Sequence, residues 1–393
     1  MRPDRLLVIV VFVLAVGGIV AYKLLGNGKP DRPDEVAARE RGPVIASQPR
    51  EFLGISLALH SSWDEHPYEQ YIREIAATGA DTICITVFGY QENASSTSIF
   101  IDARKTPSQR RLRELLEYCR RDDPKTGKHA LKVVLMPIVL LENRRGEEWR
   151  GTIRPSNWAD WWRRYTDFIL YYAGIAQDTG VDVLMVGSEL LSTEGQEDRW
   201  KRLIAQVREV YKGRLSYSAN WDHYRAVRFW QYVDIIGMTT YHDLVGNEKP
   251  TPDVLRASWR RLKGAILPWR NENHPHHPIL FTEVGWPNQV TCAKDPWNYY
   301  AARKQPAPEI QADCFEAFFS TWMDEPAVAG YLVWEWRNHP SQPVGREDTS
   351  YVPCGKPAQK VIEKHYRSAS EKKQAATRPA ESTISTTPVG ATD

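Results

Sequence analysis

Two glutamates stand out because each follows a short apolar run. Glu189 ends the segment 185–189 (MVGSE), and Glu283 ends the segment 279–283 (ILFTE). Two carboxyl groups that meet in one site can divide two tasks, since a protonated group acts as a general acid while an ionised one acts as a nucleophile. A single glutamate at such a place would more simply form a salt bridge or contact a helix N-terminus. It is therefore the pairing that indicates catalysis.

Eight apolar runs, each typical of a strand buried on both faces of a parallel sheet, alternate with helical patterns. The predicted strands are residues 52–59, 82–88, 132–140, 181–187, 214–219, 233–239, 278–282 and 328–334. The predicted helices are residues 68–78, 108–121, 157–179, 197–211, 252–267, 309–323 and 358–366, and only the fifth connection, 225–232, is too short for more than about two helical turns. This alternation predicts a (β/α)₈ TIM barrel, whose chemistry lies at the carboxyl ends of the strands. An open doubly wound sheet is the alternative, but no G-x-G-x-x-G follows the first strand.

Aromatic side chains gather at the same strand ends. Tyr241 ends the sixth strand, and Trp334 and Trp336 end the eighth. Because side chains alternate along a strand, two tryptophans that both face the barrel axis would turn the intervening Glu335 away, which makes it a poor third catalytic candidate. Trp286 and Trp63, in the loops after the seventh and first strands, could stack on flanking rings or simply pack in the core.

The segments that end in Ser188-Glu189, Thr240-Tyr241, Glu283-Val-Gly-Trp286 and Trp334-Glu-Trp336 resemble glycoside hydrolase family 113, the β-mannanase family. This family lies in the clan of (β/α)₈ retaining glycosidases with glutamates on strands four and seven. The resemblance implies that Glu189 is the acid/base, Glu283 the nucleophile, Tyr241 a hydrogen-bond donor to Glu283, and Trp334 the platform under the reacting sugar. In much of the clan an asparagine precedes the acid/base and touches the sugar 2-hydroxyl. Here that position is Ser188, and Asn220 at the end of the fifth strand is a candidate substitute.

The activity implied is hydrolysis of a β-linked polysaccharide or oligosaccharide, with β-1,4-mannan suggested by the family. In a double displacement, an ionised Glu283 would help to keep Glu189 protonated, because like charges push proton affinities apart. Carboxyl groups about 5–5.5 Å apart would give retention of configuration. The alternatives are another clan activity, such as a β-glucanase or an exo-β-glycosidase, and a non-catalytic carbohydrate-binding envelope protein on the same barrel.

The two ends of the chain differ in composition from the rest. Residues 6–22 carry no charge, so residues 1–25 are expected to be a signal anchor or a cleaved signal peptide. Residues 26–50 are interpreted as a flexible spacer, 51–367 as the barrel, and 368–393 as a disordered tail. The catalytic domain is then expected outside the cytoplasm, either membrane-anchored through the N-terminal segment or secreted.

The overall composition limits the classes of partner and cofactor that the protein is expected to bind. The 393 residues include 51 basic and 49 acidic side chains, for a net charge of +2, which does not suggest binding to nucleic acid. No metal-binding or cofactor motif is present, so no metal and no cofactor is expected. Of the five cysteines, Cys84 and Cys119 are expected to be buried free thiols, whereas Cys292 and Cys314 could form a disulfide in an oxidising compartment. The oligomeric state is not indicated.

Overall fold

The computed structural model describes residues 51–121, 130–300 and 304–377. The expected N-terminal membrane segment, the spacer and residues 378–393 of the expected tail lie outside these ranges. Within them, no helix has the length and apolar character needed to cross a membrane.

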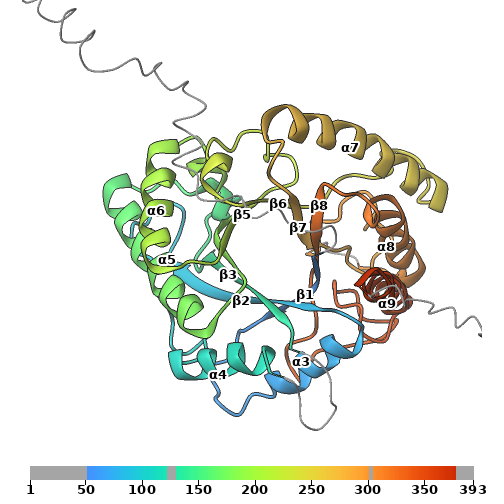
Figure 1. Ribbon diagram of the computed structural model, residues 1–393, viewed down its shortest axis with the longest axis horizontal. Helices are drawn as coiled ribbons and strands as arrows, with labels where there is room; N and C mark the ends of the chain where they lie inside the picture. Colours follow the sequence, from blue (N-terminus) through green and yellow to red (C-terminus); the bar gives the residue numbers. More distant parts are fainter. Residues whose placement is uncertain (1–50, 122–129, 301–303, 378–393) are drawn as a thin grey trace, which may run out of the picture. The chain divides into compact units, whose positions relative to one another are not determined.

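The strands form a closed parallel barrel in chain order, with β8 pairing back onto β1 (Figure 1). The strands are β1 (Phe52–Ala58), β2 (Thr82–Gln91), β3 (Lys132–Leu141), β4 (Val183–Ser188), β5 (Arg214–Ala219), β6 (Ile235–Thr239), β7 (Ile279–Val284) and β8 (Val328–Val333). Nearly every strand residue is buried, because side chains fill the barrel on one face and contact helices on the other. The predicted (β/α)₈ fold is confirmed.

The helices surround this barrel (Figure 1). They are α3 (Tyr68–Ala77), α4 (Gln109–Cys119), α5 (Trp158–Thr179), α6 (Glu197–Val210), α7 (Pro252–Asn273), α8 (Pro308–Trp322) and α9 (Pro357–Thr377). Local sequence fixes several ends: the Asn157 side chain accepts the backbone N–H groups of Ala159 and Asp160 at the start of α5, and Gly180 ends that helix with a φ of 69°. Between β5 and β6 the structure has only a 3₁₀ turn, Trp230–Tyr232, in agreement with the short fifth connection.

The last helix is longer than the sequence predicted. A disordered tail was expected from residue 368, but α9 continues to Thr377. Ala358, Ile362, Tyr366 and Ala369 are all buried, at helical spacing, so the apolar face of α9 extends past the expected boundary. The first ten residues of the expected tail are therefore helical.

All five cysteines are free thiols. Cys84 lies inside the barrel and Cys119 at the end of α4, both buried as predicted. Cys292 and Cys314 are buried within hydrogen-bonding reach of each other, but they are not bonded as the disulfide alternative required.

The seam between β8 and β1 depends on a residue without a side chain. A Cβ atom at Gly330 would lie 2.1 Å from the backbone oxygen of Phe52 and 2.5 Å from its Cβ. Real Cβ atoms do not approach backbone this closely, so a side chain here would push the two strands apart.

We therefore expect Gly330→Ala to lower the free energy of unfolding by about 1–3 kcal/mol, measured by guanidinium denaturation. Gly174→Ala is the matched control, because Gly174 lies inside α5 and a Cβ there meets nothing within 4 Å. This control should be neutral or more stable than the wild type by roughly 0.5–1 kcal/mol, since alanine is the better helix former. Equal stability of the two variants would contradict the close approach at the seam.

Candidate active site

Both glutamates lie at the carboxyl ends of their strands. Glu189 directly follows β4, and Glu283 is the penultimate residue of β7. The pairing register shifts beside each of them, between Met185 and Ser188 in β4 and again along β7. Such irregularities re-aim side chains next to active sites. Here they turn two glutamates, distant in sequence, toward one barrel opening.

The backbone of Glu189 has an unusual conformation. Its φ is 52°, and it is the one non-glycine residue with a positive φ among those that the structure describes. Its backbone N–H donates to the backbone oxygen of Ser218 at 2.8 Å, which ties the residue to the end of β5. Conformations of this kind persist where the surrounding structure enforces them, and they cluster at functional sites.

The two oxygens of the Glu283 carboxyl group have different surroundings. The Tyr241 hydroxyl donates a hydrogen bond to Oε2 at 2.7 Å, as the resemblance implied. Oε1 is buried and accepts no hydrogen bond from any described residue. One oxygen is thus held in place while the other keeps its lone pairs available to an electrophile.

An arginine that the sequence analysis did not single out completes the charged cluster. Arg150 lies in the loop between β3 and α5, and its Nη2 donates to Glu189 Oε2 at 2.5 Å. Both side chains are largely buried, with exposed fractions of 20% and 7%. Arg144 and Arg145, which precede Arg150 in the same loop, are exposed.

Burial and the charge of Glu189 raise the pKa of Glu283 to about 8, whereas Arg150 and the Tyr241 hydrogen bond oppose this rise. Burial and the repulsion between the two carboxyl groups thus favour the protonated form of Glu283. The expected distribution, with Glu283 ionised and Glu189 protonated, stays a prediction. In the structure the guanidinium of Arg150 contacts Glu189 directly, which favours charge on that group.

A third carboxyl group, that of Glu335, interacts electrostatically with Glu283. Glu335 is half-buried, burial raises its pKa to about 7, and its charge raises the pKa of Glu283. The premise that turned Glu335 away from the site, strand alternation through residues 334–336, does not hold. Strand β8 ends at Val333, so the side-chain alternation assumed for residues 334–336 does not apply to them.

The two tryptophans after β8 lie in different surroundings. Trp334 remains partly exposed and packs against the inner barrel cluster. Trp336 is buried on the helix side, where its indole N–H donates to Glu74 Oε2 at 3.0 Å. Only Trp334 is therefore placed to serve as a platform in the opening.

Trp286 cannot stack on a sugar in this structure. It is 0% exposed and packs edge-to-face against Phe315 and Trp259. The substrate-stacking prediction for Trp286 is contradicted, and the alternative of core packing is correct. Trp63 is 57% exposed after β1 and stays a predicted stacking residue. Asn220 follows β5, where its amide donates to Asp222 Oδ1 at 2.6 Å, and its contact with the substrate also stays a prediction.

The loop after β8 supplies a second tyrosine, Tyr351, close to Tyr241. The ring of Tyr351 lies 6.0 Å from that of Tyr241 and 6.0 Å from that of Tyr299. Its hydroxyl donates to the backbone oxygen of Pro296. No motif in the sequence points to Tyr351, because it lies far beyond the end of β8 in a loop without periodicity.

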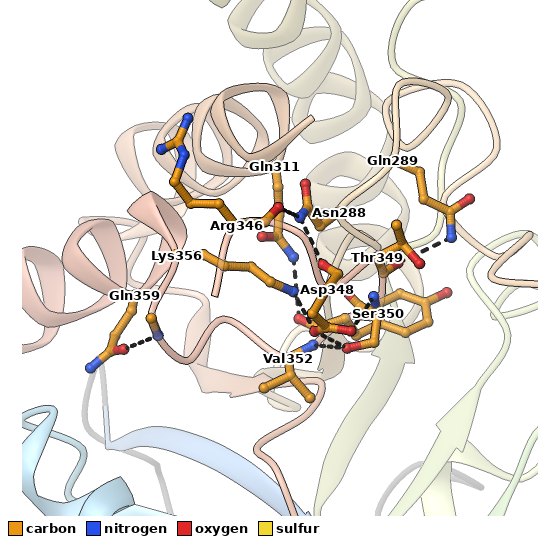
Figure 2. Close-up of polar contacts among 12 residues, drawn as sticks. Asn288, Gln289, Gln311, Arg346, Asp348, Thr349, Ser350, Val352, Lys356 and Gln359 are labelled. Carbon is orange, nitrogen blue, oxygen red and sulfur yellow. Dashed lines mark hydrogen bonds and ion pairs between the residues drawn. The ribbon is translucent and has the colours of Figure 1, made fainter. Parts of the chain in front are cut away.

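A buried polar network that includes Asn288, Gln311, Asp348 and Lys356 (Figure 2) surrounds the backbone next to Tyr351. Lys356, whose side chain is 0% exposed, pairs with Asp348 at 2.8 Å. Asn288 donates to the backbone oxygens of Arg346 and Asp348, and Gln311 donates to that of Tyr351. These bonds link the loop after β7 to the loop after β8, so both sides of Glu283 are fixed by the same network.

In the part of the chain that the structure describes, no group of three or more histidine, cysteine, aspartate and glutamate side chains is arranged to hold a metal ion. The chemistry that the site supports directly is proton transfer and nucleophilic attack by its own carboxyl groups.

The raised pKa of Glu283 predicts how stability depends on pH. The folded protein holds this proton up to about pH 8, whereas an unfolded chain releases it near the ordinary value of 4.5. Unfolding within this window releases a proton, so the free energy of unfolding should fall as the pH rises through it. Glu283→Gln is neutral throughout and should melt above the wild type by a larger margin at pH 8 than at pH 4.5. The same margin at both pH values in thermal unfolding would contradict the raised pKa.

Comparison with known proteins adds to this geometry. The sequence profile described as Glycoside Hydrolase Family 113 matches residues 56–356. No curated protein matches the chain in sequence.

Solved structures share the barrel. A family 113 β-mannanase from Alicyclobacillus acidocaldarius, in complex with ManMIm, is 28% identical with a TM-score of 0.68, over 81% of this chain and 98% of that one. A complex of a family 113 β-1,4-mannanase is 23% identical with a TM-score of 0.70, over 81% of this chain and 99% of that one. A Faecalibacterium prausnitzii β-glucuronidase, 10% identical with a TM-score of 0.53 over 82% of this chain and 49% of that one, shares the fold alone.

The family match spans well over half of the chain and includes both glutamates, Tyr241 and Trp334. The chain therefore belongs to glycoside hydrolase family 113.

Proposed function

We propose that this protein hydrolyses β-1,4-mannan, or an oligosaccharide derived from it, with retention of anomeric configuration. The observation that carries the proposal is the asymmetric environment of Glu283. Tyr241 holds Oε2 at 2.7 Å, Oε1 is buried without a partner among the described residues, and Glu189 lies close enough for its charge to raise the pKa of Glu283.

In the first step, Oε1 of Glu283 attacks the anomeric carbon as the bond to the glycosidic oxygen breaks. Glu189 donates its proton to that oxygen, because an alkoxide is a poor leaving group. The products are a covalent glycosyl-enzyme ester and a free sugar hydroxyl. Glu189 is left as a carboxylate beside Arg150, which stabilises its negative charge.

In the second step, Glu189 takes a proton from water, and the hydroxide oxygen attacks the anomeric carbon from the face that the leaving group occupied. The ester bond to Glu283 breaks and the carboxylate is regenerated. Two inversions at one carbon give net retention. Tyr241 keeps its hydrogen bond to Oε2 of the departing carboxylate, which favours the ionised form of Glu283.

The choice of mannan rests on the family and on the 28% identical relative, which is described as a β-mannanase. Within the site, we propose that Trp334 stacks under the reacting sugar and that the exposed Trp63 stacks on a neighbouring one. Tests of substrate choice should therefore include mannans, glucans and xylans in parallel.

Substitution of either glutamate tests the assigned roles. We expect Glu189→Ala and Glu283→Ala each to lower kcat on mannan by about 10²–10⁴-fold. Added azide should rescue both variants, giving a β-glycosyl azide with Glu189→Ala and an α-glycosyl azide with Glu283→Ala, because azide replaces water in one case and the nucleophile in the other. Proton NMR of the wild-type reaction should show the β-anomer of the product first. Initial release of the α-anomer would end the double-displacement scheme, and turnover of glucan or xylan in place of mannan would end the substrate assignment.

Removal of the Tyr241 hydroxyl tests its contact with the nucleophile. Tyr241→Phe should lower kcat/KM by about ten- to a hundredfold, since hydrogen bonds to charged groups contribute about 1.5–3 kcal/mol. The lost hydrogen bond should also raise the pKa of Glu283, which is about 8 in the substrate-free site, so the alkaline limb of the kcat/KM profile should move to higher pH. Tyr351→Phe is the control, because its hydroxyl bonds Pro296 instead, and this variant should leave the alkaline limb in place. An unshifted limb in Tyr241→Phe would show that the contact does not act on ionisation.

A further inference from the structure

Arg150 is held in a defined position over the catalytic pair. It opens the 3₁₀ turn Arg150–Thr152, in which the backbone N–H of Trp149 donates to Thr152 Oγ1 at 3.1 Å. The Trp149 ring lies so close to Gly151 that a Cβ there would meet it at 2.4 Å. The turn therefore fixes the backbone from which the guanidinium reaches Glu189.

The donors of Arg150 are used unevenly. Nη2 bonds Glu189 Oε2 at 2.5 Å, while Nε is buried and has no hydrogen-bond partner among the residues that the structure describes. An unsatisfied buried donor costs free energy, about 1–3 kcal/mol in typical proteins. The present contact with Glu189 thus leaves the guanidinium with a donor that a ligand hydroxyl could satisfy.

The electrostatic surroundings of this cluster are mostly acidic or phenolic. Six other titratable groups interact with Arg150, Glu189 or Glu283, and they come from five segments: Cys84 in β2, Glu194 after β4, Tyr241 after β6, Tyr299 after β7, and Glu335 and Tyr351 after β8. Arg150 is the cation in this set. Its position therefore decides which carboxyl group is favoured as the anion.

The substrate-free arrangement and the proposed reaction require opposite proton positions. With Arg150 bonded to Glu189, the proton belongs on Glu283, whereas double displacement needs it on Glu189. The number of protons is the same in both states. Only their location differs, so no external acid is required to pass from one to the other.

We propose that Arg150 is a positioning residue that determines which catalytic glutamate carries their shared proton, and that it releases Glu189 when a sugar hydroxyl engages its free Nε. This inference rests on the proposed function. The proton that leaves Glu283 is the one that Glu189 accepts, and the ionised Glu283 is then ready to attack. After the proton has been donated to the leaving group, Arg150 can again pair with the Glu189 carboxylate.

The proton location can be measured without turnover. In protein labelled with ¹³Cδ-glutamate, Glu189→Gln and Glu283→Gln assign the two carboxyl signals. At pH 6 the wild type should show Glu189 as a carboxylate and Glu283 as an acid. Arg150→Gln should move the Glu189 signal toward the acid position and the Glu283 signal toward the carboxylate position. Arg150→Lys, which keeps the cation, should retain most of the wild-type pattern.

Kinetics supply the second readout. Removal of a cation beside a carboxylate favours the protonated form, so Arg150→Gln should move the alkaline limb of kcat/KM on mannan upward by about 1 pH unit or more. Arg144→Gln removes the same charge from an exposed position of the same loop and should leave that limb in place. An aryl β-glycoside with a good leaving group needs little acid assistance, so with this substrate Arg150→Gln and wild type should share the same alkaline limb.

A double-variant cycle ties the effect to Glu189. In the Glu189→Gln background, Arg150→Gln should shift the carboxyl signal of Glu283 only by the amount that the lost direct attraction between Arg150 and Glu283 causes. Unchanged carboxyl signals in Arg150→Gln, together with reduced activity and an unmoved alkaline limb, would overturn the proposal and leave Arg150 a structural residue. A wild-type protein inactive on every β-glycoside would overturn the proposed function instead, while the NMR result would still decide where Arg150 places the proton.

Discussion

The site depends on burial of like charges at one end of a barrel. Glu189 and Glu283 are 5% and 3% exposed, and their mutual repulsion in a poorly solvated opening can be relieved only by a proton, a cation or a hydrogen bond. In the structure the guanidinium of Arg150 contacts Glu189 and the hydroxyl of Tyr241 contacts Glu283, while burial and the charge of Glu189 raise the pKa of Glu283 and so favour a proton there. In the proposed reaction, entry of a sugar changes how the proton, the guanidinium and the hydroxyl are shared between the two carboxyl groups.

This arrangement requires a rigid support, because a displacement of about 1 Å in a reacting group can reduce the rate strongly. The closed hydrogen-bonded barrel fixes the strand ends, and the strand irregularities at β4 and β7 aim the glutamates inward. Beyond the strands, the buried Lys356–Asp348 pair and Asn288 connect the loops after β7 and β8 behind Tyr351. Such a buried network, satisfied on both sides, confers a unique geometry more than it confers stability.

The predictions at strand ends succeeded where local pattern was sufficient. The strands, most of the helices, the placement of both glutamates at one rim and the Tyr241 contact follow from apolar periodicity, from the barrel rule and from the family resemblance. The stacking prediction for Trp286 and the strand alternation assumed for residues 334–336 failed because these residues lie beyond the last paired residue of their strands. There the direction of a side chain is set by packing against other segments, and strand alternation no longer governs it.

From the sequence alone, then, the fold class, the family and the two carboxyl groups could be recognised, since each is written in short-range patterns of apolar residues and in motifs a few residues long. Tertiary structure alone decided that Arg150 pairs with Glu189, that Glu335 interacts with Glu283, and that burial beside Glu189 raises the pKa of Glu283. Charge–charge interactions and desolvation depend on distances between segments far apart in the chain, and these distances exist only after the barrel has closed.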